Sequence, residues 1–291
     1  GPDDDGLDLL DLDGGVVRGL IDRRPRRGLH DLIAGHGVLA DERRALAAAV
    51  VASSAAVTPV AAQEGIYVPL LTYRTGAFAG SGIPIADGMH DYLTMLNERD
   101  GGIGGEKIQT PECETAYNTE KGVECYEATK GSGALVYNPL STGITYQLIP
   151  KVSADKIPLY TPGYGRTSAK NGKVFEWVFN APANYWDGAS VAIKYLLDQN
   201  GGDLNGKKIA LVYHNSAYGK EPIRTLQELS KKHGFTLTEL PVDPPGQEQK
   251  SQWLQIRRDK PDYVLMWGWG VMNQTAIQEA ANIRFPMENF I

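Results

Sequence analysis

IYVPLLTYRTGAFAGSGIPIADGMHDYLTMLNERDGGIGGEKI, residues 66–108, is the stretch that decides the fold. Its first six residues form an apolar run of strand length. A Gly-rich segment, residues 75–82, predicts a turn, and apolar residues then recur at helical spacing over residues 85–96. The helix is expected to end at the glycines that follow Asp100, and residues 107–110 begin a second strand. A strand, a helix and a strand joined by short connections predict a parallel sheet with a right-handed crossover.

The rest of the chain repeats this alternation. In the first half, further strands are predicted over residues 134–137, 157–160 and 174–179, which would complete one five-stranded sheet. In the second half, we expect a helix over residues 185–199 and strands over residues 208–213, 235–240 and 263–267. The sequence therefore predicts an α/β protein with two βαβ domains, residues 64–182 and 183–291. The second domain is expected to be incomplete, because an apolar segment begins where the chain ends at Ile291.

Composition limits the classes of partner. The 291 residues suffice for two modest domains. The formal net charge is −6 and there is no long basic run, which argues against nucleic acid as a partner. Residues 1–42 contain no Lys, Ser, Thr, Asn, Gln, Cys, Met or aromatic residue, and we interpret them as an upstream or disordered extension without assigned function.

Residues 43–63 have the three parts of a secretory signal peptide. An arginine pair precedes an apolar run over residues 45–60, and Val60 and Ala62 suit the −3 and −1 positions of a cleavage site. An Ala-rich internal helix is the alternative, but such a helix should carry a polar stripe and this run has none. The run is also shorter and less hydrophobic than a membrane span requires. We therefore expect an exported protein without a membrane anchor of its own.

The chain has two cysteines, Cys113 and Cys125. In an oxidising compartment they are expected to form a disulfide, which for so short a loop stabilises the fold by about 3 kcal/mol. Two buried free thiols are the alternative. A zinc site is not expected, because two cysteines without a nearby histidine cannot complete a zinc shell.

The sequence contains no recognisable catalytic set. The five histidines are scattered, and neither a Gly-x-Ser-x-Gly elbow nor a His-Glu-x-x-His pattern is present. The glycines of residues 101–105 lie between a helix and a strand, whereas a dinucleotide fingerprint lies between a strand and the following helix. We therefore expect no enzymatic activity, no cofactor and no metal.

The loops that follow the strands are better candidates for a binding site, because open α/β sheets bind ligands at the carboxyl ends of their strands. Ser141 and Thr142 lie at the predicted start of a helix, where hydroxyl groups and free amides bind anions, although plain capping explains either residue alone. Tyr164 adds an aromatic face in the next loop. Tyr218 and Trp269 occupy matching loops of the second half, where they fit a wall on which a ligand stacks.

The order of several motifs resembles a known family. The motifs are TGAFAGSG (residues 75–82), NERDGGIGGEKI (97–108), NPLSTG (138–143), IPLYTPGYG (157–165), KKIALVYHNSAYGKEP (207–222) and KPDYVLMWGWG (260–270). Together with the signal-like segment, they resemble the type I periplasmic solute-binding proteins of ABC transporters. The resemblance is to the branched-chain amino acid (Leu/Ile/Val) binding family in particular, and it covers roughly residues 66–291.

This resemblance implies two Rossmann-like lobes that close over a small ligand. It implies that the loops with Ser141, Thr142, Tyr164 and Gly165 bind the carboxylate and amino groups of an amino acid. It also places Ser81 at the position of a first-loop aromatic residue, Tyr218 at a closing-lobe tyrosine and Trp269 close to another aromatic contact. The family's acidic residue for the amino group is expected beyond Ile291.

The implied function is that of a monomeric periplasmic protein that delivers a small carboxylate-bearing solute to the permease of an ABC transporter, and contacts the membrane only through that permease. The solute would be a branched-chain or other amino acid, an amide or an aromatic acid. The chain departs from the family at residues 163–165, where Tyr164 lies between two glycines and beside Arg166, and these side chains also suit a larger or aromatic carboxylate. An extracellular sensor domain of the same fold is the alternative function.

Overall fold

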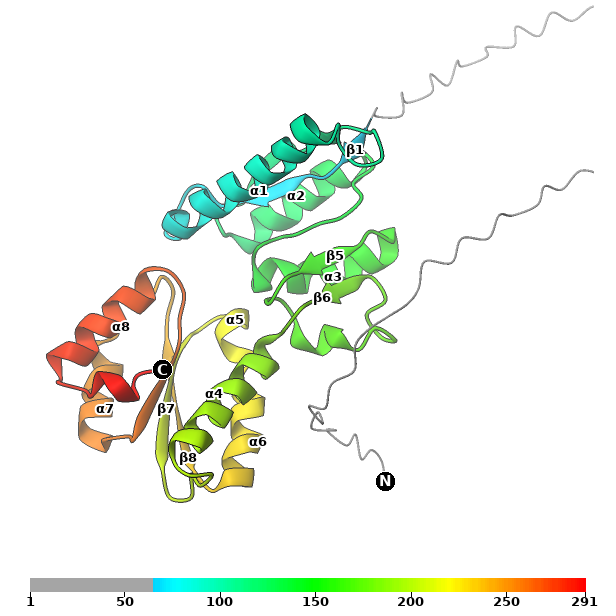
Figure 1. Ribbon diagram of the computed structural model, residues 1–291. Helices are drawn as coiled ribbons and strands as arrows, with labels where there is room; N and C mark the ends of the chain where they lie inside the picture. Colours follow the sequence, from blue (N-terminus) through cyan, green and yellow to red (C-terminus); the bar gives the residue numbers. More distant parts are fainter. Residues whose placement is uncertain (1–64) are drawn as a thin grey trace, which may run out of the picture. The chain divides into compact units, whose positions relative to one another are not determined.

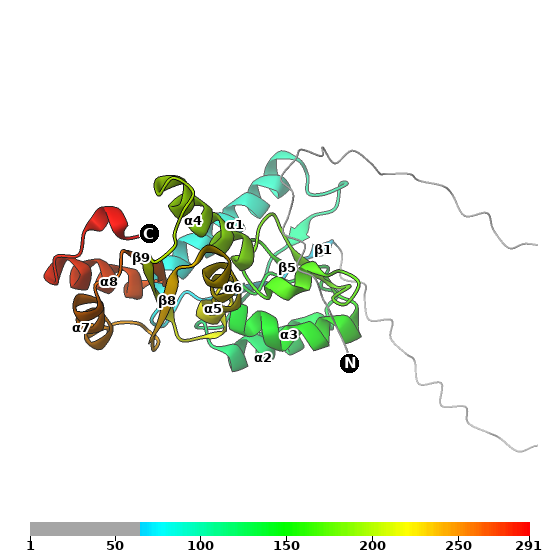
Figure 2. The same ribbon diagram turned by 90° about the horizontal axis from the view of Figure 1, so that it is seen from below.

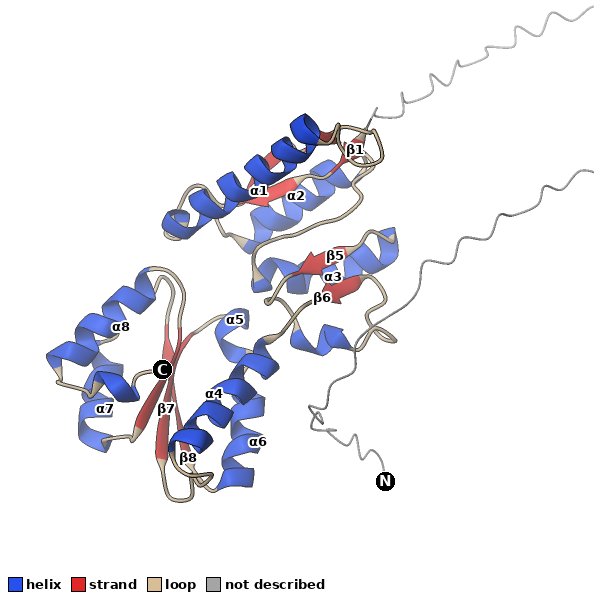
Figure 3. Ribbon diagram, viewed as in Figure 1, coloured by secondary structure: helices blue, strands red, loops and turns tan. Residues whose placement is uncertain are grey.

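The computed structural model describes residues 65–291, in which strands and helices alternate along the chain (Figure 1). The predicted upstream extension, residues 1–42, and the predicted signal peptide, residues 43–63, lie outside the described residues. The described part has the predicted α/β architecture of two Rossmann-like lobes, with helices packed on parallel strands in each (Figure 3). We refer to the elements up to β6 as the first lobe and to those from α4 onward as the second lobe.

The elements of the first lobe follow the predicted order. They are β1 (Ile66–Tyr67), β2 (Leu70–Thr72), α1 (Ala79–Arg99), β3 (Ile108–Gln109), β4 (Glu112–Glu114), α2 (Thr119–Lys130), α3 (Thr142–Asp155), β5 (Leu159–Thr161), the 3-10 helix η1 (Thr167–Lys170) and β6 (Val178–Asn180). The first crossover is parallel as predicted, since Ile66 pairs with Ile108 and Leu70 with Glu112.

The prediction of one regular five-stranded sheet in the first lobe is wrong in detail. The structure has three parallel pairs instead, β1–β3, β2–β4 and β5–β6. Pro69 and Pro111 separate the first two pairs, because a proline has no N–H to donate to a ladder. The backbone amides of Val68 and Leu70 still donate to the opposite segment, both at 2.9 Å, so the two pairs continue one another.

Residues 134–137 form only a bridge where a strand was predicted. Tyr137 pairs with Leu159 in parallel, and the amide of Leu135 donates to the carbonyl of Tyr67 at 3.1 Å. The segment therefore links the β1–β2 region to β5 without a regular ladder of its own.

Helix α1 begins earlier than the sequence predicts. Residues 75–78 make the turn, whereas Ala79 to Gly82 already belong to the first turn of the helix. Gly82 is buried there because the helix lies directly on Tyr73. The end of α1 is as predicted, with Asp100 as its C-cap and Gly101 at φ 75°.

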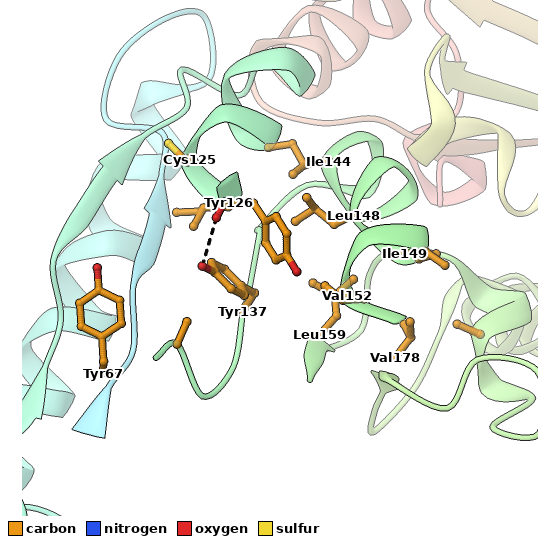
Figure 4. Packing of buried hydrophobic residues seen from close by; sticks show 13 residues of the cluster. Tyr67, Cys125, Tyr126, Tyr137, Ile144, Leu148, Ile149, Val152, Leu159 and Val178 are labelled. Atoms are coloured by element: carbon orange, nitrogen blue, oxygen red, sulfur yellow. Dashed lines mark hydrogen bonds between the residues drawn. The ribbon is translucent and has the colours of Figure 1, made fainter. Parts of the chain in front are cut away.

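The core of the first lobe lies between the strands and helices α2 and α3 (Figure 4). Tyr126 and Tyr137 pack together with ring centroids 4.7 Å apart, and both are fully buried. The Tyr137 hydroxyl lies 2.7 Å from Thr129 Oγ1, and Tyr126 donates to Asp155 at 2.7 Å. This core therefore encloses two aromatic rings whose hydroxyl groups are hydrogen-bonded.

The second lobe agrees closely with the sequence. Its elements are α4 (Tyr185–Gln199), β7 (Lys208–His214), α5 (Ala217–Lys220), α6 (Ile223–His233), β8 (Thr236–Val242), α7 (Lys250–Asp259), β9 (Tyr263–Trp267), α8 (Val271–Asn282) and the 3-10 helix η2 (Met287–Asn289). The sheet order is β8-β7-β9, all parallel. Phe290 forms a further parallel bridge to Val264, so the chain returns to the outer side of β9.

Helices cover both faces of this second sheet (Figures 1 and 2). Residues Ile209 and Leu211 of β7 pack with α4 and α6, whereas Ala210 and Val212 pack with α7 and α8. A parallel sheet buried on both faces reads as a continuous apolar run, which explains the sequence IALV in β7. Because both faces are covered, a site is expected at the carboxyl ends of the strands, where open α/β sheets bind ligands.

Candidate ligand-binding site

One cavity of about 370 Å³ lies at the carboxyl ends of the strands and has walls from both lobes. Its lining residues are Tyr73, Ile85, Tyr117, Leu140, Thr142, Pro162, Gly163, Tyr164, Tyr185, Tyr218 and Trp269. Tyr73 directly follows β2, Tyr164 follows β5, and Trp269 follows β9. This is the position at which open α/β sheets bind ligands.

The start of helix α3 supplies the polar part of the first-lobe wall. Ser141 is the N-cap and its side chain accepts from the amide of Ile144 at 3.4 Å. The hydroxyl of Thr142 accepts from the amide of Gly165 at 3.3 Å and lies 2.8 Å from the hydroxyl of Tyr185. The amides of a first helical turn have no partner within the helix and favour an anion at this end.

Tyr164 is held rigidly by polar contacts. Its hydroxyl accepts from the amide of Leu140 at 2.7 Å and also bonds Asn138, and its carbonyl accepts from the side chain of Asn180. Gly165 has φ 93°, and a Cβ there would lie 3.0 Å from the Thr161 side chain. Only glycine fits that turn without strain, and the turn fixes where Tyr164 stands.

Several lining loops have an unusual backbone. Ala116, Tyr117 and Leu140 all have positive φ, at 50°, 58° and 54°, although none is glycine. Such conformations cost free energy and persist where the surrounding structure imposes them, often at ligand sites. Tyr117 and Leu140 both line the cavity, so the strained backbone and the cavity coincide.

The tyrosines of the cavity are neutral. Burial raises the pKa of Tyr73 to about 12, and it also raises the pKa values of Tyr117, Tyr164, Tyr185 and Tyr218. No side chain that lines the cavity carries a charge at neutral pH, within the part of the chain that the structure describes. The wall therefore offers aromatic faces and neutral hydrogen-bonding groups.

Tyr218 organises the second-lobe wall. Its hydroxyl donates to the carbonyl of Gly268 at 3.0 Å, which fixes the loop that carries Trp269. The centroid of its ring lies 5.3 Å from that of Tyr185 and 6.5 Å from that of Trp267. Trp267 therefore packs behind the cavity wall. His214 lies 6.2 Å from the same ring, and burial lowers the pKa of its imidazole.

Further contacts join the lobes beside the cavity. Glu221 bonds the hydroxyl of Tyr146 on α3 and accepts from the amide of Thr167 at 3.2 Å. Phe78, at the start of α1, packs against His214 with ring centroids 5.9 Å apart. Neither Glu221 nor Phe78 is among the lining residues, so these contacts hold the walls together without occupying the cavity.

The structure brings most of the sequence-predicted site residues together. Thr142, Tyr164, Tyr218 and Trp269 line the cavity, the amide of Gly165 donates to Thr142, and Ser141 caps the helix that Thr142 begins. Ser81 does not line the cavity and lies in the first turn of α1.

Sequence reasoning missed three cavity tyrosines, Tyr73, Tyr117 and Tyr185. Tyr73 could have been found, because it directly follows an apolar strand in the chain. Tyr185 gave a weaker signal, because it starts a helix just after the N-cap Asn184 and does not follow a strand. Tyr117 gave no sequence signal, because its position depends on the positive φ angles of Ala116 and of Tyr117 itself.

The predicted disulfide between Cys113 and Cys125 is present and joins β4 to α2. It lies next to the loop that carries Tyr117. Among the described residues, no group of three or more His, Cys, Asp or Glu side chains is arranged to hold a metal ion. Over the same residues, none of the helices combines the length and hydropathy of a membrane span.

Comparison with known proteins identifies the fold and the family. The family model described as periplasmic binding protein matches residues 65–285. The chain is 26% identical over 193 residues to the Leu/Ile/Val-binding protein homolog 3 of Brucella melitensis biotype 1, which covers 66% of this chain and 50% of that protein.

Solved structures agree with this match. A protein from the Pseudomonas fluorescens group, described as an ABC transporter permease, is 43% identical to this chain and superposes with a TM-score of 0.69. The match covers 78% of this chain and 56% of that protein. An R. palustris solute-binding protein in complex with benzoate has 21% identity and a TM-score of 0.65 over 76% of this chain and 61% of its own, which supports the fold. The chain thus spans about half the length of the relatives it matches first. It belongs to the type I periplasmic binding protein family.

Proposed function

We propose that the protein captures a small carboxylate-bearing solute in the periplasm and delivers it to the permease of an ABC transporter. The observation that carries this proposal is the cavity between the lobes, which combines the start of α3 with an aromatic wall. The free amides at that helix start suit a carboxylate. Thr142, Tyr164, Tyr218 and Trp269 are the side chains proposed to contact the solute.

The proposed mechanism is closure without any chemical step. The lobes, residues 64–182 and 183–291, would approach each other about a hinge near residues 180–184, and the closed form would present the solute to the permease. A solute that touches both lobes binds the closed form better than the open form, and that difference drives closure. The mature protein is proposed to act as a monomer and to contact the membrane only through the permease.

Isothermal titration calorimetry on the full-length protein tests this proposal. The panel is leucine, valine, phenylalanine, benzoate and 4-hydroxybenzoate, with glucose as a solute that lacks a carboxylate. We expect at least one carboxylate to bind with a Kd of about 1 μM or below, equivalent to about −8 kcal/mol. Failure of all five to bind would contradict the proposal.

Glu221 is expected to support closure from outside the cavity. In the Glu221→Ala variant the Tyr146 hydroxyl and the Thr167 amide lose their partner in the other lobe. Hydrogen bonds to a charged group contribute about 1.5–3 kcal/mol, and partial exposure places this one at the low end. We therefore expect the affinity for the identified solute to fall about tenfold.

The matched control is Glu228→Ala on α6, because Glu228 pairs only across one helical turn with Lys231 on the surface. That variant should bind as the wild type does. Small-angle X-ray scattering of the ligand-free Glu221→Ala variant should show a larger radius of gyration. Equal affinities for both variants would contradict a role for Glu221 in closure.

A further inference from the structure

A buried histidine, His214, ends strand β7 at a contact between the two lobes. Only 4% of the residue is exposed. The centroid of its ring lies 5.9 Å from that of Phe78, at the start of α1 in the first lobe, and 6.2 Å from that of Tyr218 in the second lobe. One side of the imidazole is therefore covered by a residue that an opening movement of the lobes would carry away.

The two ring nitrogens of His214 differ in their surroundings. Nδ1 lies 2.7 Å from Ser216 Oγ, and Ser216 is the N-cap of α5, the helix that carries Tyr218. Nε2 is buried and has no hydrogen-bond partner among the described residues. A neutral imidazole can leave Nε2 without a proton, whereas a protonated one has an N–H group on both nitrogens. Protonation in this contact would therefore bury both a positive charge and an unpaired donor.

The groups around the imidazole offer it no counter-charge. On the first-lobe side lies Phe78, and behind it lies Tyr117, with ring centroids 4.8 Å apart. On the second-lobe side the titratable groups are Tyr218 on α5 and Asp243 after β8, and Asp243 is exposed and accepts from an asparagine side chain at 2.6 Å. Both tyrosines are neutral, because burial raises their pKa values. Burial lowers the pKa of His214, and no charged side chain of the described residues shifts it.

We propose that protonation of His214 separates the two lobes, so that the protein releases its solute when its surroundings become acidic. This inference rests on the proposed function, because it concerns the closure that holds the solute. A charged imidazole needs water or an anion beside it, and water reaches this one when Phe78 moves away from the second lobe.

The direction of the effect follows from the pKa of the imidazole in the two forms. In the open form the imidazole is hydrated, and its pKa is expected near the ordinary value of about 6.5. In the closed form burial lowers that pKa, so the closed form binds fewer protons than the open form. Closure is therefore fully favoured above about pH 6.5. It weakens as the pH falls below that value, until the closed form is protonated as well.

Titration calorimetry at about pH 7.5 and about pH 5.5 tests this inference. The probe is whichever of leucine, valine, phenylalanine, benzoate and 4-hydroxybenzoate binds most tightly at the higher pH. We expect its affinity for the wild type to fall about five- to tenfold at the lower pH. In the His214→Asn variant, which keeps a polar group for Ser216 but cannot be protonated, the affinity should be the same at both pH values.

The matched control is His233→Gln. Burial also lowers the pKa of His233, but this residue ends α6 just before β8 begins, at the opposite end of the sheet from His214. The affinity of this variant should fall with pH as that of the wild type does. The comparison also removes any effect of pH on the solute itself, because both variants bind the same probe.

A second measurement uses the wild type alone and does not depend on the folding of a variant. Calorimetry at about pH 6 in two buffers of different ionisation enthalpy gives the number of protons released on binding. We expect a release of about half a proton for each solute bound. The imidazole resonances of His214 should also titrate at a lower pH in the bound protein than in the free protein.

The outcomes separate this inference from the function on which it rests. If the wild type binds the probe equally well at both pH values and releases no proton, the inference is wrong and solute capture stands. An equal fall in the wild type and in His214→Asn would overturn it too, as would loss of the pH dependence in His233→Gln. If none of the five solutes binds at the higher pH, the proposed function fails, and the inference falls with it.

Discussion

Replacing Gly82 with alanine is expected to destabilise the protein by about 3 kcal/mol and to weaken solute binding at least tenfold, because overpacking a well-filled contact forces the backbone to move. A Cβ at this position would lie 1.9 Å from the Tyr73 carbonyl oxygen and 2.4 Å from Cδ2 of its ring. Helix α1 would have to move away from β2 to make room. Tyr73 lines the cavity, so the same movement would displace part of the binding wall.

Gly88 is the matched control for this prediction. It lies in the same helix, it is exposed, and a Cβ there would meet no atom within 4 Å. Gly88→Ala should therefore stabilise the protein by up to about 1 kcal/mol, the usual difference between the two residues inside a helix. Urea unfolding of both variants should show a lower free energy of unfolding for Gly82→Ala and a higher one for Gly88→Ala than for the wild type. A Gly82→Ala variant as stable as the wild type would show that α1 does not rest on Tyr73 as described.

Removal of the disulfide is expected to lower the free energy of unfolding by about 3 kcal/mol, since Cys113 and Cys125 close a short loop. In a protein of this size that corresponds to a fall in Tm of about 6–12 °C. The bond joins β4, which has only one strand partner, to α2. Between them lies Tyr117, so the affinity for the solute should fall as well.

The Cys113→Ala/Cys125→Ala variant tests this second prediction. Calorimetric scans of the wild type and of the variant, each with and without a reducing agent, separate the bond from the side chains. The reducing agent should lower the Tm of the wild type and leave that of the variant unchanged. A wild-type Tm that does not respond to complete reduction would contradict the prediction.

The second lobe could be predicted almost fully from the sequence. The predicted bounds of α4 and β9 agree with the structure, because each element has a clear period and a clear stop. Asn184 and Asp187 form a capping box at the start of α4, and Gly234 ends α6 in the left-handed region. Local signals and tertiary packing agree in this lobe.

The first lobe was harder to predict because local signals there conflict with the tertiary structure. Pro69 and Pro111 interrupt two strands that are nevertheless hydrogen-bonded on both sides of the prolines. Gly80 and Gly82 suggested a turn, yet both lie inside α1, and at Gly82 only a residue without a side chain fits against Tyr73. Packing thus outweighs residue preference at this point in the chain.

The candidate site was predicted in part. The motif NPLSTG gave the helix start with Ser141 and Thr142, and the strand ends gave Tyr164, Tyr218 and Trp269. Tyr73 follows a strand and could have been found in the same way, whereas Tyr117 and Tyr185 reach the cavity through a loop conformation and a helix start that no short motif encodes. The unpaired indole N–H of Trp269 is likewise a property of the folded environment and not of the sequence.

Strand β7 has a consequence for how the second lobe loses its structure. Its alternate residues belong to two separate apolar clusters, one on each face of the sheet. Neither cluster can come apart without disturbing the strand that the other also needs. The two layers of the lobe are therefore expected to unfold together as one cooperative unit.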